Sequence, residues 1–507
     1  MMKRIALALL VWMLAASQAA AQFYQSDFPP DEFKARWARV FDKIGPQAVA
    51  VLQGVSLTNG YIMPRQHNTF YYLCGIETPG AYLLLDGRTR KVTLYLPPRN
   101  AALERAEGKV LSSDDAVQVQ KLTGVDQVLD ASKEMNGSWP SSVASGTGAA
   151  AGGAPGGGGP GGGPGGGPRL AIIYAEFEPA EGQGQSRGEL RTANAAIAND
   201  AWDGRLPRES RFLELLQFRN RGAEIRNLSP ILDELRAIKS SREIALIRRA
   251  SQLAGLGLME AMRSTEAGVY EYQLDAAARY IYLVNDAKLE AYRSITATGT
   301  ENINNMHYYR NAKRLEDGDL VLMDYAPDYR YYVSDIGRVW PVNGTYAPWQ
   351  RELLQFTLEY HKAVMSRVKP GVTPKQILDD AKAAMEPIIA KTKWSKPIYE
   401  QAARQLIATG GGAMSHMVGM AVHDVGSYRD GLKPGHVFSV DPQLRVPEEN
   451  LYLRFEDTIV VTETGYENFT HFIPELDDME KIVREKGLVQ KAPAGPSDEA
   501  LRGKAGR

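Results

Sequence analysis

The spacing of apolar residues in the N-terminal half of the chain predicts short strands that alternate with helices. Residues 31–44 place apolar side chains at helical intervals and predict an amphipathic helix, and residues 100–107 predict another. Short apolar runs that predict strands lie at residues 48–52, 70–74, 81–85, 91–96 and 170–174. Because strands and helices alternate, this half of the chain predicts an α/β domain.

The pattern changes at Ser229, after which long helices alternate with groups of strands. Ser229 before Pro230 and the capping-box pattern from Ser240 to Glu243 both mark helix starts. Further helices are predicted at residues 270–283, 348–368 and 374–390, and strands at residues 320–342 and 416–462. The order helix, helix, strands therefore occurs twice, which predicts two related halves with a site in the cleft between them.

Residues 320–342 predict a β-hairpin that carries two aspartates. An apolar run ends in Asp324, a turn with Pro327 follows, and a β-prone run leads to Asp335. A turn between the aspartates brings their carboxylates to one face, where they repel each other unless a cation lies between them. Two surface aspartates beside a turn remain the alternative for this segment taken alone.

Length and charge narrow the classes of protein. A chain of 507 residues is too long for one ordinary core and predicts two domains. We place them at residues 22–228 and 229–484, followed by a disordered tail at residues 485–507. The formal net charge of -1 argues against nucleic acid or an anionic membrane as the main partner.

The first residues have the pattern of a signal peptide. Lys3 and Arg4 precede an apolar stretch at residues 5–16, and small residues follow as far as Ala21. The apolar stretch is too short to span a bilayer, so we expect cleavage after Ala21, with an uncleaved anchor as the alternative. The mature chain is then periplasmic or secreted, without stable membrane insertion. Cys74 is the only cysteine, which excludes an internal disulfide bond.

Residues 146–168 interrupt the N-terminal domain with a glycine- and proline-rich insertion. Its Gly-Gly-Gly-Pro repeat has a period of four, which excludes the three-residue period of collagen. Because no side chain there can build a core, we expect a disordered surface loop without catalytic residues.

Three later segments add candidate metal ligands. The segment SHMVGMAVHDVG contains His416 and His423. An apolar run ends in Asp441, and Glu456 lies in a strand-like segment where an unpaired carboxylate is costly to bury. Carboxylates and an imidazole suit manganese, cobalt, zinc or iron(II), and bridging carboxylates suit two ions about 3.5–4 Å apart. Such ions activate a water and polarise a carbonyl, which predicts amide hydrolysis without a protein nucleophile.

These segments resemble the catalytic domain of the pita-bread metallopeptidases, in particular aminopeptidase P and prolidase. The resemblance covers residues 229–465 and is carried by LRAIKSSREIALIRRAS, SITATGTENINNMHYYRN, the hairpin, SHMVGMAVHDVG and LRFEDTIVVTETG. The segment RQHNTFYYLCGIETPGAYLLL makes the N-terminal domain similar to theirs as well. The resemblance implies an α/β (α+β) protein, with an N-terminal α/β domain followed by a pseudo-symmetric pita-bread catalytic domain.

The resemblance also implies a metal centre. Its ligands would be Asp324, Asp335, His416, Asp441 and Glu456. They would hold two divalent ions, manganese first, with zinc, cobalt or iron as alternatives. Asp335 and Glu456 would bridge the ions, and Asp441 stands where the family has a glutamate that is both ligand and general base.

Three more residues complete the implied site. His307 and His423 correspond to histidines that assist the tetrahedral intermediate and proton transfer, and Arg454 matches an arginine that orients the final glutamate. The implied activity is removal of the N-terminal residue from peptides with proline in second position, through a metal-bridging water. Family members commonly form dimers or tetramers, so we expect a homo-oligomer.

Three departures from the family pattern leave alternatives open. Asp441 is one methylene shorter than the family's glutamate, Gly412 replaces a pocket histidine, and Gln443 replaces a glycine. Displacing a catalytic group by about 1 Å can cost about 100-fold in rate. The alternatives are a prolidase restricted to Xaa-Pro dipeptides and a catalytically weak or inactive pita-bread binding protein.

Overall fold

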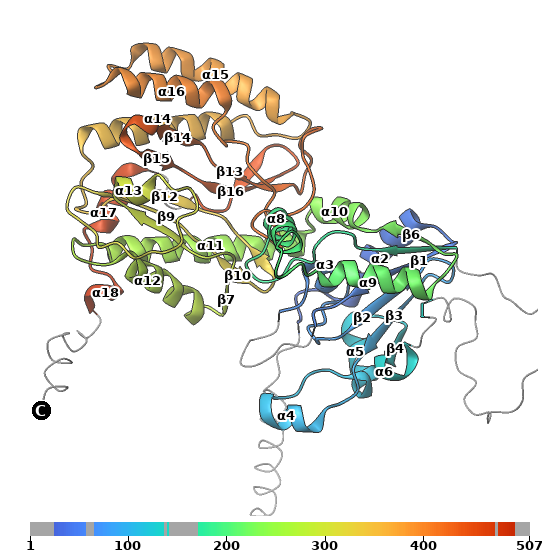
Figure 1. Cartoon of the computed structure of the whole chain (residues 1–507). Helices are drawn as coiled ribbons and strands as arrows, with labels where there is room; N and C mark the ends of the chain where they lie inside the picture. Colours follow the sequence, from blue (N-terminus) through green and yellow to red (C-terminus); the bar gives the residue numbers. More distant parts are fainter. Residues whose placement is uncertain (1–24, 57–64, 136–138, 141–170, 472–474, 492–507) are drawn as a thin grey trace, which may run out of the picture. The chain divides into compact units, whose positions relative to one another are not determined.

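The computed structural model of the chain contains two compact units (Figure 1). It describes residues 25–56, 65–135, 139–140, 171–471 and 475–491. The N-terminal unit consists of Met1–Gly182 and Arg191–Leu235, and the C-terminal unit of Gln183–Leu190 and Arg236–Arg507. The boundary expected from the sequence lies between residues 228 and 229, and nothing in the sequence indicated that residues 183–190 belong to the C-terminal unit. The predicted signal peptide and the whole of the glycine-rich insertion lie outside the described residues.

A six-stranded mixed sheet forms the centre of the N-terminal unit. Its strands are β1 (Ala48–Gln53), β2 (Tyr82–Asp86), β3 (Lys91–Leu96), β4 (Gln127–Asp130), β5 (Ile172–Ala175) and β6 (Glu224–Asn227). They lie in the order β4-β3-β2-β1-β5-β6. The strands β1, β2 and β3 pair antiparallel, whereas β4, β5 and β6 join in parallel. Leu84, Tyr95 and Ile173 from the sheet share a core with Trp139.

The helices in this part of the chain include several that the sequence did not predict. They are α2 (Pro30–Ile44), α3 (Asn68–Cys74), α4 (Ala101–Glu107), α5 (Ala116–Thr123), α6 (Ala131–Glu134), α8 (Arg187–Ala198), α9 (Arg208–Arg219) and α10 (Ser229–Ala237). The expectation of a strand at residues 70–74 is wrong, since α3 occupies it. Every residue of α3 is buried, so its apolar run carries no period that separates helix from strand. Burial also raises the pKa of the Cys74 thiol to about 12.

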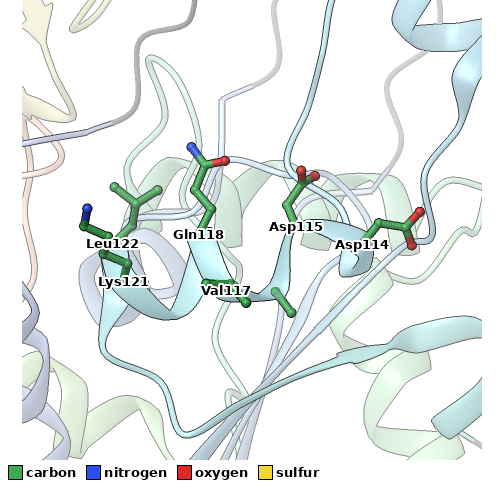
Figure 2. A pocket seen from close by; sticks show the side chains of 7 residues that line it. Asp114, Asp115, Val117, Gln118, Lys121 and Leu122 are labelled. Carbon is green, nitrogen blue, oxygen red and sulfur yellow. The ribbon is translucent and has the colours of Figure 1, made fainter. Parts of the chain in front are cut away.

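A pocket of about 600 Å³ lies beside the start of α5 in the N-terminal unit (Figure 2). Asp114, Asp115, Gln118 and Lys121 are its polar lining residues. None of the candidate metal ligands lines this pocket, and all of them belong to the C-terminal unit.

Short antiparallel sheets form the interior of the C-terminal unit. Their strands are β7 (Leu289–Glu290), β8 (Ile295–Thr298), β9 (Leu320–Asp324), β10 (Pro327–Tyr329), β11 (Tyr332–Val333), β12 (Gly337–Pro341), β13 (Val437–Val440), β14 (Gln443–Val446), β15 (Leu451–Arg454), β16 (Asp457–Val461) and β17 (Tyr466–Asn468). They pair in the orders β12-β9-β8, β11-β10-β7, β13-β16-β17 and β14-β15. The predicted hairpin is confirmed, because β9 pairs antiparallel with β12 and β10 pairs with β11 inside it.

Helices lie on both sides of these strands. They are α11 (Ser241–Arg263), α12 (Glu271–Val284), α13 (Thr300–Ile303), α14 (Pro348–Met365), α15 (Pro374–Lys391), α16 (Pro397–Thr409), α17 (Leu476–Val483) and α18 (Leu488–Lys491). Figure 1 shows α11 and α12 on one side of the strands and α14, α15 and α16 on the other. Ser240 and Glu243 form the predicted capping box of α11. No helix in the described part of the chain combines the length and apolar character needed to cross a bilayer.

Residues 485–491, which the sequence assigned to a disordered tail, are ordered and include α18. The backbone N–H of Gly487 donates to the carbonyl of Arg263 over 2.9 Å, and the side chain of Gln490 donates to the carbonyl of Ser264 over the same distance. These bonds satisfy carbonyls at the C-terminal end of α11 and hold residues 487–491 against it. Residues 492–507 lie outside the described residues.

A buried ion cluster fixes the loop after His423. The carboxylate of Asp424 lies 2.5 Å from Nη2 of Arg236 and 3.1 Å from Nζ of Lys239, and all three side chains are about 1% exposed. Burial by itself raises the pKa of Asp424, but the charges of Arg236 and Lys239 outweigh burial and lower it below its usual range. Asp424 is therefore ionised at neutral pH and is the counter-charge for two buried cations.

Replacing this carboxylate tests the cluster. At pH 7, Asp424→Asn should lower the free energy of unfolding of the C-terminal unit by about 3–5 kcal/mol, because it removes the carboxylate that faces two buried cations. Because the folded pKa of Asp424 lies below its unfolded value, the stabilisation is complete above about pH 5 and is lost as pH falls through the folded pKa. Chemical denaturation at pH 7 and pH 3.5 should show a smaller difference between variant and parent at the lower pH.

The exposed pair of Lys375 and Asp379 supplies the control. Asp379→Asn should change the unfolding free energy by less than about 1 kcal/mol at either pH. An equal loss in Asp424→Asn at both pH values would show that the ionised carboxylate is not the stabilising group.

Candidate metal centre

The hairpin brings Asp324 and Asp335 together. Asp324 ends β9, and Asp335 lies two residues before β12, whose Gly337 pairs opposite Asp324. The hydroxyl of Tyr292 lies 2.5 Å from one carboxylate oxygen of Asp324 and 2.7 Å from one of Asp335. A hydroxyl has a single proton to donate, so the two carboxylates share one donor and lie close enough to share a cation.

A tight backbone contact joins this hairpin to the segment of Glu456. Glu456 lies between β15 and β16, and its N–H donates to the carbonyl of Gly337 over 3.0 Å, with the reverse bond at 3.3 Å. A Cβ at Gly337 would lie 3.2 Å from Nε of Arg454 and 3.2 Å from Oε2 of Glu456. A side chain at position 337 would therefore press on Arg454 and Glu456, which explains why glycine suits this close approach.

His416 completes a group of three ligands with Asp335 and Glu456. Its Nδ1 lies 3.2 Å from the carbonyl of Met417, which accepts a hydrogen bond from the Nδ1–H and leaves Nε2, 3.3 Å from Asp335, to face the site. One ligand atom from each of Asp335, His416 and Glu456 lies within 4.8 Å of the others. Two carboxylates and an imidazole at this spacing fit one divalent ion of the borderline class.

The remaining predicted ligands, Asp324 and Asp441, surround the guanidinium of Arg454. Nη1 of Arg454 lies 2.5 Å from Asp324, whereas Nε and Nη2 lie 2.9 and 2.7 Å from the two oxygens of Asp441. Nη2 also contacts Glu456. Arg454 therefore contacts three of the four acidic residues. The resemblance had implied such a contact only with Glu456.

Burial makes these acids reluctant to ionise. It raises the pKa of Asp324 to about 8, and it also raises the pKa values of Glu456 and Asp441, while the charge of Arg454 opposes each shift. Burial also raises the pKa of Asp335, but the hydrogen bond and charge of His416 outweigh it and lower the pKa below its usual range.

The electrostatics of the site favour added positive charge. The exposed fractions of the four acidic residues are 3% or less, and Arg454 and a protonated His416 supply at most two positive charges. Four ionised carboxylates therefore leave a net negative charge in a buried space, which a divalent cation neutralises. The donor set fits metal binding on this ground as well as on geometry.

Two departures from the family pattern, Gly412 and Gln443, lie in direct contact. Gly412 has a φ of +83°, and a Cβ there would meet Nε2 of Gln443 and the carbonyl oxygen of Asp441, each at 3.0 Å. Nε2 of Gln443 lies 2.5 Å from the carboxylate of Asp441. The side chain of Gln443 therefore lies beside Gly412, which has no side chain, and it donates a hydrogen bond to the carboxylate of Asp441.

The two predicted histidines lie beside His416. The ring of His423 is 4.2 Å from that of His416, and the exposed ring of His307 is 6.5 Å from His423, centre to centre. Nδ1 of His423 lies 2.7 Å from a carboxylate oxygen of Glu189. Sequence reasoning missed Glu189 and Tyr292, because neither has a motif or a spacing that relates it to the ligands.

Comparison with known proteins agrees with the resemblance seen in the sequence, for the N-terminal and the C-terminal unit alike. The family model "Aminopeptidase P, N-terminal domain" matches residues 33–144, and "Metallopeptidase family M24" matches residues 245–463. Two Xaa-Pro aminopeptidases are each 28% identical to this chain. The Haemophilus influenzae protein aligns over 91% of this chain and 99% of its own length, and the Escherichia coli protein over 88% and 95%.

Solved structures agree with these matches. Proline aminopeptidase P II from Yersinia pestis is 25% identical with a TM-score of 0.67, over 90% of this chain and 99% of its own. A putative aminopeptidase P from Bacillus anthracis, 22% identical, has the same fold with a TM-score of 0.71, over 91% and 100%. The predicted fold class is therefore confirmed. Because the two family models match one unit each and the fold agrees throughout, the chain belongs to the aminopeptidase P family of metallopeptidases.

Proposed function

We propose that this chain is an Xaa-Pro aminopeptidase that hydrolyses the bond between the N-terminal residue of a peptide and a proline in second position. The observation that carries the proposal is the convergence of Asp335, His416 and Glu456 on one point, with Asp324 and Asp441 close by. The names of the relatives supply the substrate class, and this chain spans nearly their full length.

The proposed centre holds two divalent ions, manganese first, which when bound supply an activated water and polarise the substrate carbonyl. Asp335, His416 and Glu456 would hold one ion. Asp324 and Asp441 would complete the set of ligands for the pair of ions. Arg454 donates hydrogen bonds to carboxylate oxygens of Asp324 and Asp441. To bind metal through these oxygens, the two carboxylates would have to give up those hydrogen bonds.

The chain's own residues orient the reacting groups and move protons. Asp441 is the proposed general base, and its raised pKa brings it nearer to the neutral range in which such a base is efficient. Arg454 and Gln443 fix the direction of its carboxylate. His307, beside His423, is proposed to hydrogen-bond the substrate carbonyl, and His423 to take up a proton on Nε2 and pass it to the leaving proline nitrogen.

A binding protein without turnover is the second candidate. The observation in its favour is that three donors from Arg454 and Gln443 already engage the Asp441 carboxylate. A carboxylate held in this way is less free to bind metal or to accept a proton from water.

Metal removal tests the function itself. Dialysis against a chelator should lower release of the first residue from a tripeptide with proline in second position by at least about 100-fold, and manganese should restore it. Asp335→Asn should lose both the metal and the activity, because Asp335 belongs to the group of three ligands. Metal content and amino-acid release measure the two effects.

The exposed Asp379 serves again as control, since Asp379→Asn should leave metal content and rate unchanged. Turnover of dipeptides but not tripeptides would identify a prolidase. A metal-loaded protein that releases nothing from either would identify the binding protein.

The shortened acid gives a second test. Asp441→Glu alone should raise kcat/KM only slightly, because Gln443 fills the space that the longer side chain needs. Asp441→Glu combined with Gln443→Gly should raise kcat/KM by about 10- to 100-fold. Gln443→Gly alone is the matched control. Equal rates for parent, single and double variants would show that the length of this side chain does not limit catalysis.

We also propose export and self-association. The basic and apolar pattern of residues 3–16 and the small residues up to Ala21 support removal of a signal peptide into the periplasm or the medium. N-terminal sequencing of the mature protein from a bacterial host should begin at Gln22. A cytoplasmic protein that retains residues 1–21 would contradict export. The sedimentation coefficient of the purified protein should be that of a homo-oligomer.

A further inference from the structure

Residues 183–190 contact the candidate site although the chain on either side of them belongs to the N-terminal unit. A Cβ at Gly184 would lie 3.9 Å from the carbonyl oxygen of Ala291 and 4.0 Å from Cα of Tyr292. The segment therefore passes close to Tyr292, whose hydroxyl contacts two of the predicted metal ligands. The hydroxyl of Ser186 accepts a hydrogen bond from the backbone N–H of His423 over 3.2 Å. The segment lies outside both ranges that the family models match.

The contact between Glu189 and His423 determines where the imidazole carries its proton. Burial raises the pKa of Glu189, but its own backbone N–H and the contact with His423 outweigh burial and hold the pKa below its usual value, so this carboxylate is ionised at neutral pH. An ionised carboxylate only accepts hydrogen bonds. Nδ1 of His423, 2.7 Å away, must therefore be the donor, and Nε2 of the neutral ring is left as an acceptor.

We propose that Glu189 is a positioning residue of the active site, which fixes the tautomer and the ring orientation of His423. Ser186 and Glu189 lie one helical turn apart at the start of α8, and together they hold the backbone and the ring of His423. The inference rests on the proposed function, because it assigns His423 a role in that reaction. A carboxylate that orients a histidine from its far nitrogen commonly changes activity by about 10- to 100-fold.

The exposure of this pair separates its effect on catalysis from any effect on stability. The side chain of Glu189 is 58% exposed and that of His423 is 37% exposed. Ion pairs in such surroundings contribute little to folding. Removing the carboxylate should therefore leave a folded protein with its metal content unchanged, so a loss of rate can be read as a loss of orientation.

Kinetics of the full-length, metal-loaded protein form the first part of the test. Glu189→Gln keeps the size of the side chain but adds an amide donor, so it no longer selects the Nδ1–H form. We expect kcat to fall by about 10-fold or more with KM changed less than about 2-fold. Glu448→Gln, which removes an exposed carboxylate elsewhere in the same unit, is the control and should match the parent.

Nitrogen NMR of the metal-free, full-length protein labelled with 15N-histidine forms the second part and needs no turnover. The His423 signals, assigned by their absence in His423→Asn, should show a protonated Nδ1 in the parent and a shift towards the Nε2–H tautomer in Glu189→Gln. An unchanged nitrogen pattern overturns the inference, as does an unchanged kcat in an active enzyme. If the parent shows no peptidase activity, the proposed function fails, whereas the NMR result still decides whether Glu189 sets the tautomer.

Discussion

Repulsion among four buried carboxylates is the constraint on which the C-terminal unit depends. They are Asp324, Asp335, Asp441 and Glu456. Burial removes water from each carboxylate, which is costly unless the protein replaces the lost hydrogen bonds. The fold therefore places hydrogen-bond donors from several segments around these groups. The guanidinium of Arg454 contacts three of these groups, and the imidazole of His416 contacts the fourth. The charge that these donors leave uncompensated is what divalent ions neutralise, and metal affinity and fold stability therefore share one electrostatic origin.

The constraint is satisfied only when distant segments come together. Arg454 and Asp324 are 130 residues apart in sequence, and the backbone bonds between Gly337 and Glu456 join the two groups of strands that carry the acids. Neither group of strands alone holds the acidic residues together with Arg454 and His416. The site is therefore a property of the assembled unit, and long-range closure of this kind forms slowly in folding.

Local sequence patterns predicted much of the fold and part of the site. The apolar run that ends in Asp324 and the β-prone run before Asp335 predicted a hairpin that the structure contains, and Ser240 with Glu243 predicted the start of α11. These features depend on spacing within a few residues. The resemblance to a known family then implied which other acidic residues and histidines belong to the site. Spacing alone could not have brought these residues together.

Features that depend on tertiary contact could not be predicted. The run at residues 70–74 reads equally well as helix or strand, because it is buried on every side. Gly412 and Gln443 look like separate departures from the family until their contact is seen. Glu189 and Tyr292 reach the site across 234 and 32 residues of sequence, to His423 and Asp324, and no periodicity relates residues so far apart.

The single cysteine has a practical consequence for work on this molecule. Cys74 is fully buried in α3, and its thiolate is strongly disfavoured, so thiol-specific reagents should not label the native protein. Labelling then requires that α3 open, which makes Cys74 a built-in reporter of local unfolding in the N-terminal unit. For the same reason, a cysteine engineered at the surface would be the sole site for attaching a spectroscopic probe to the folded chain.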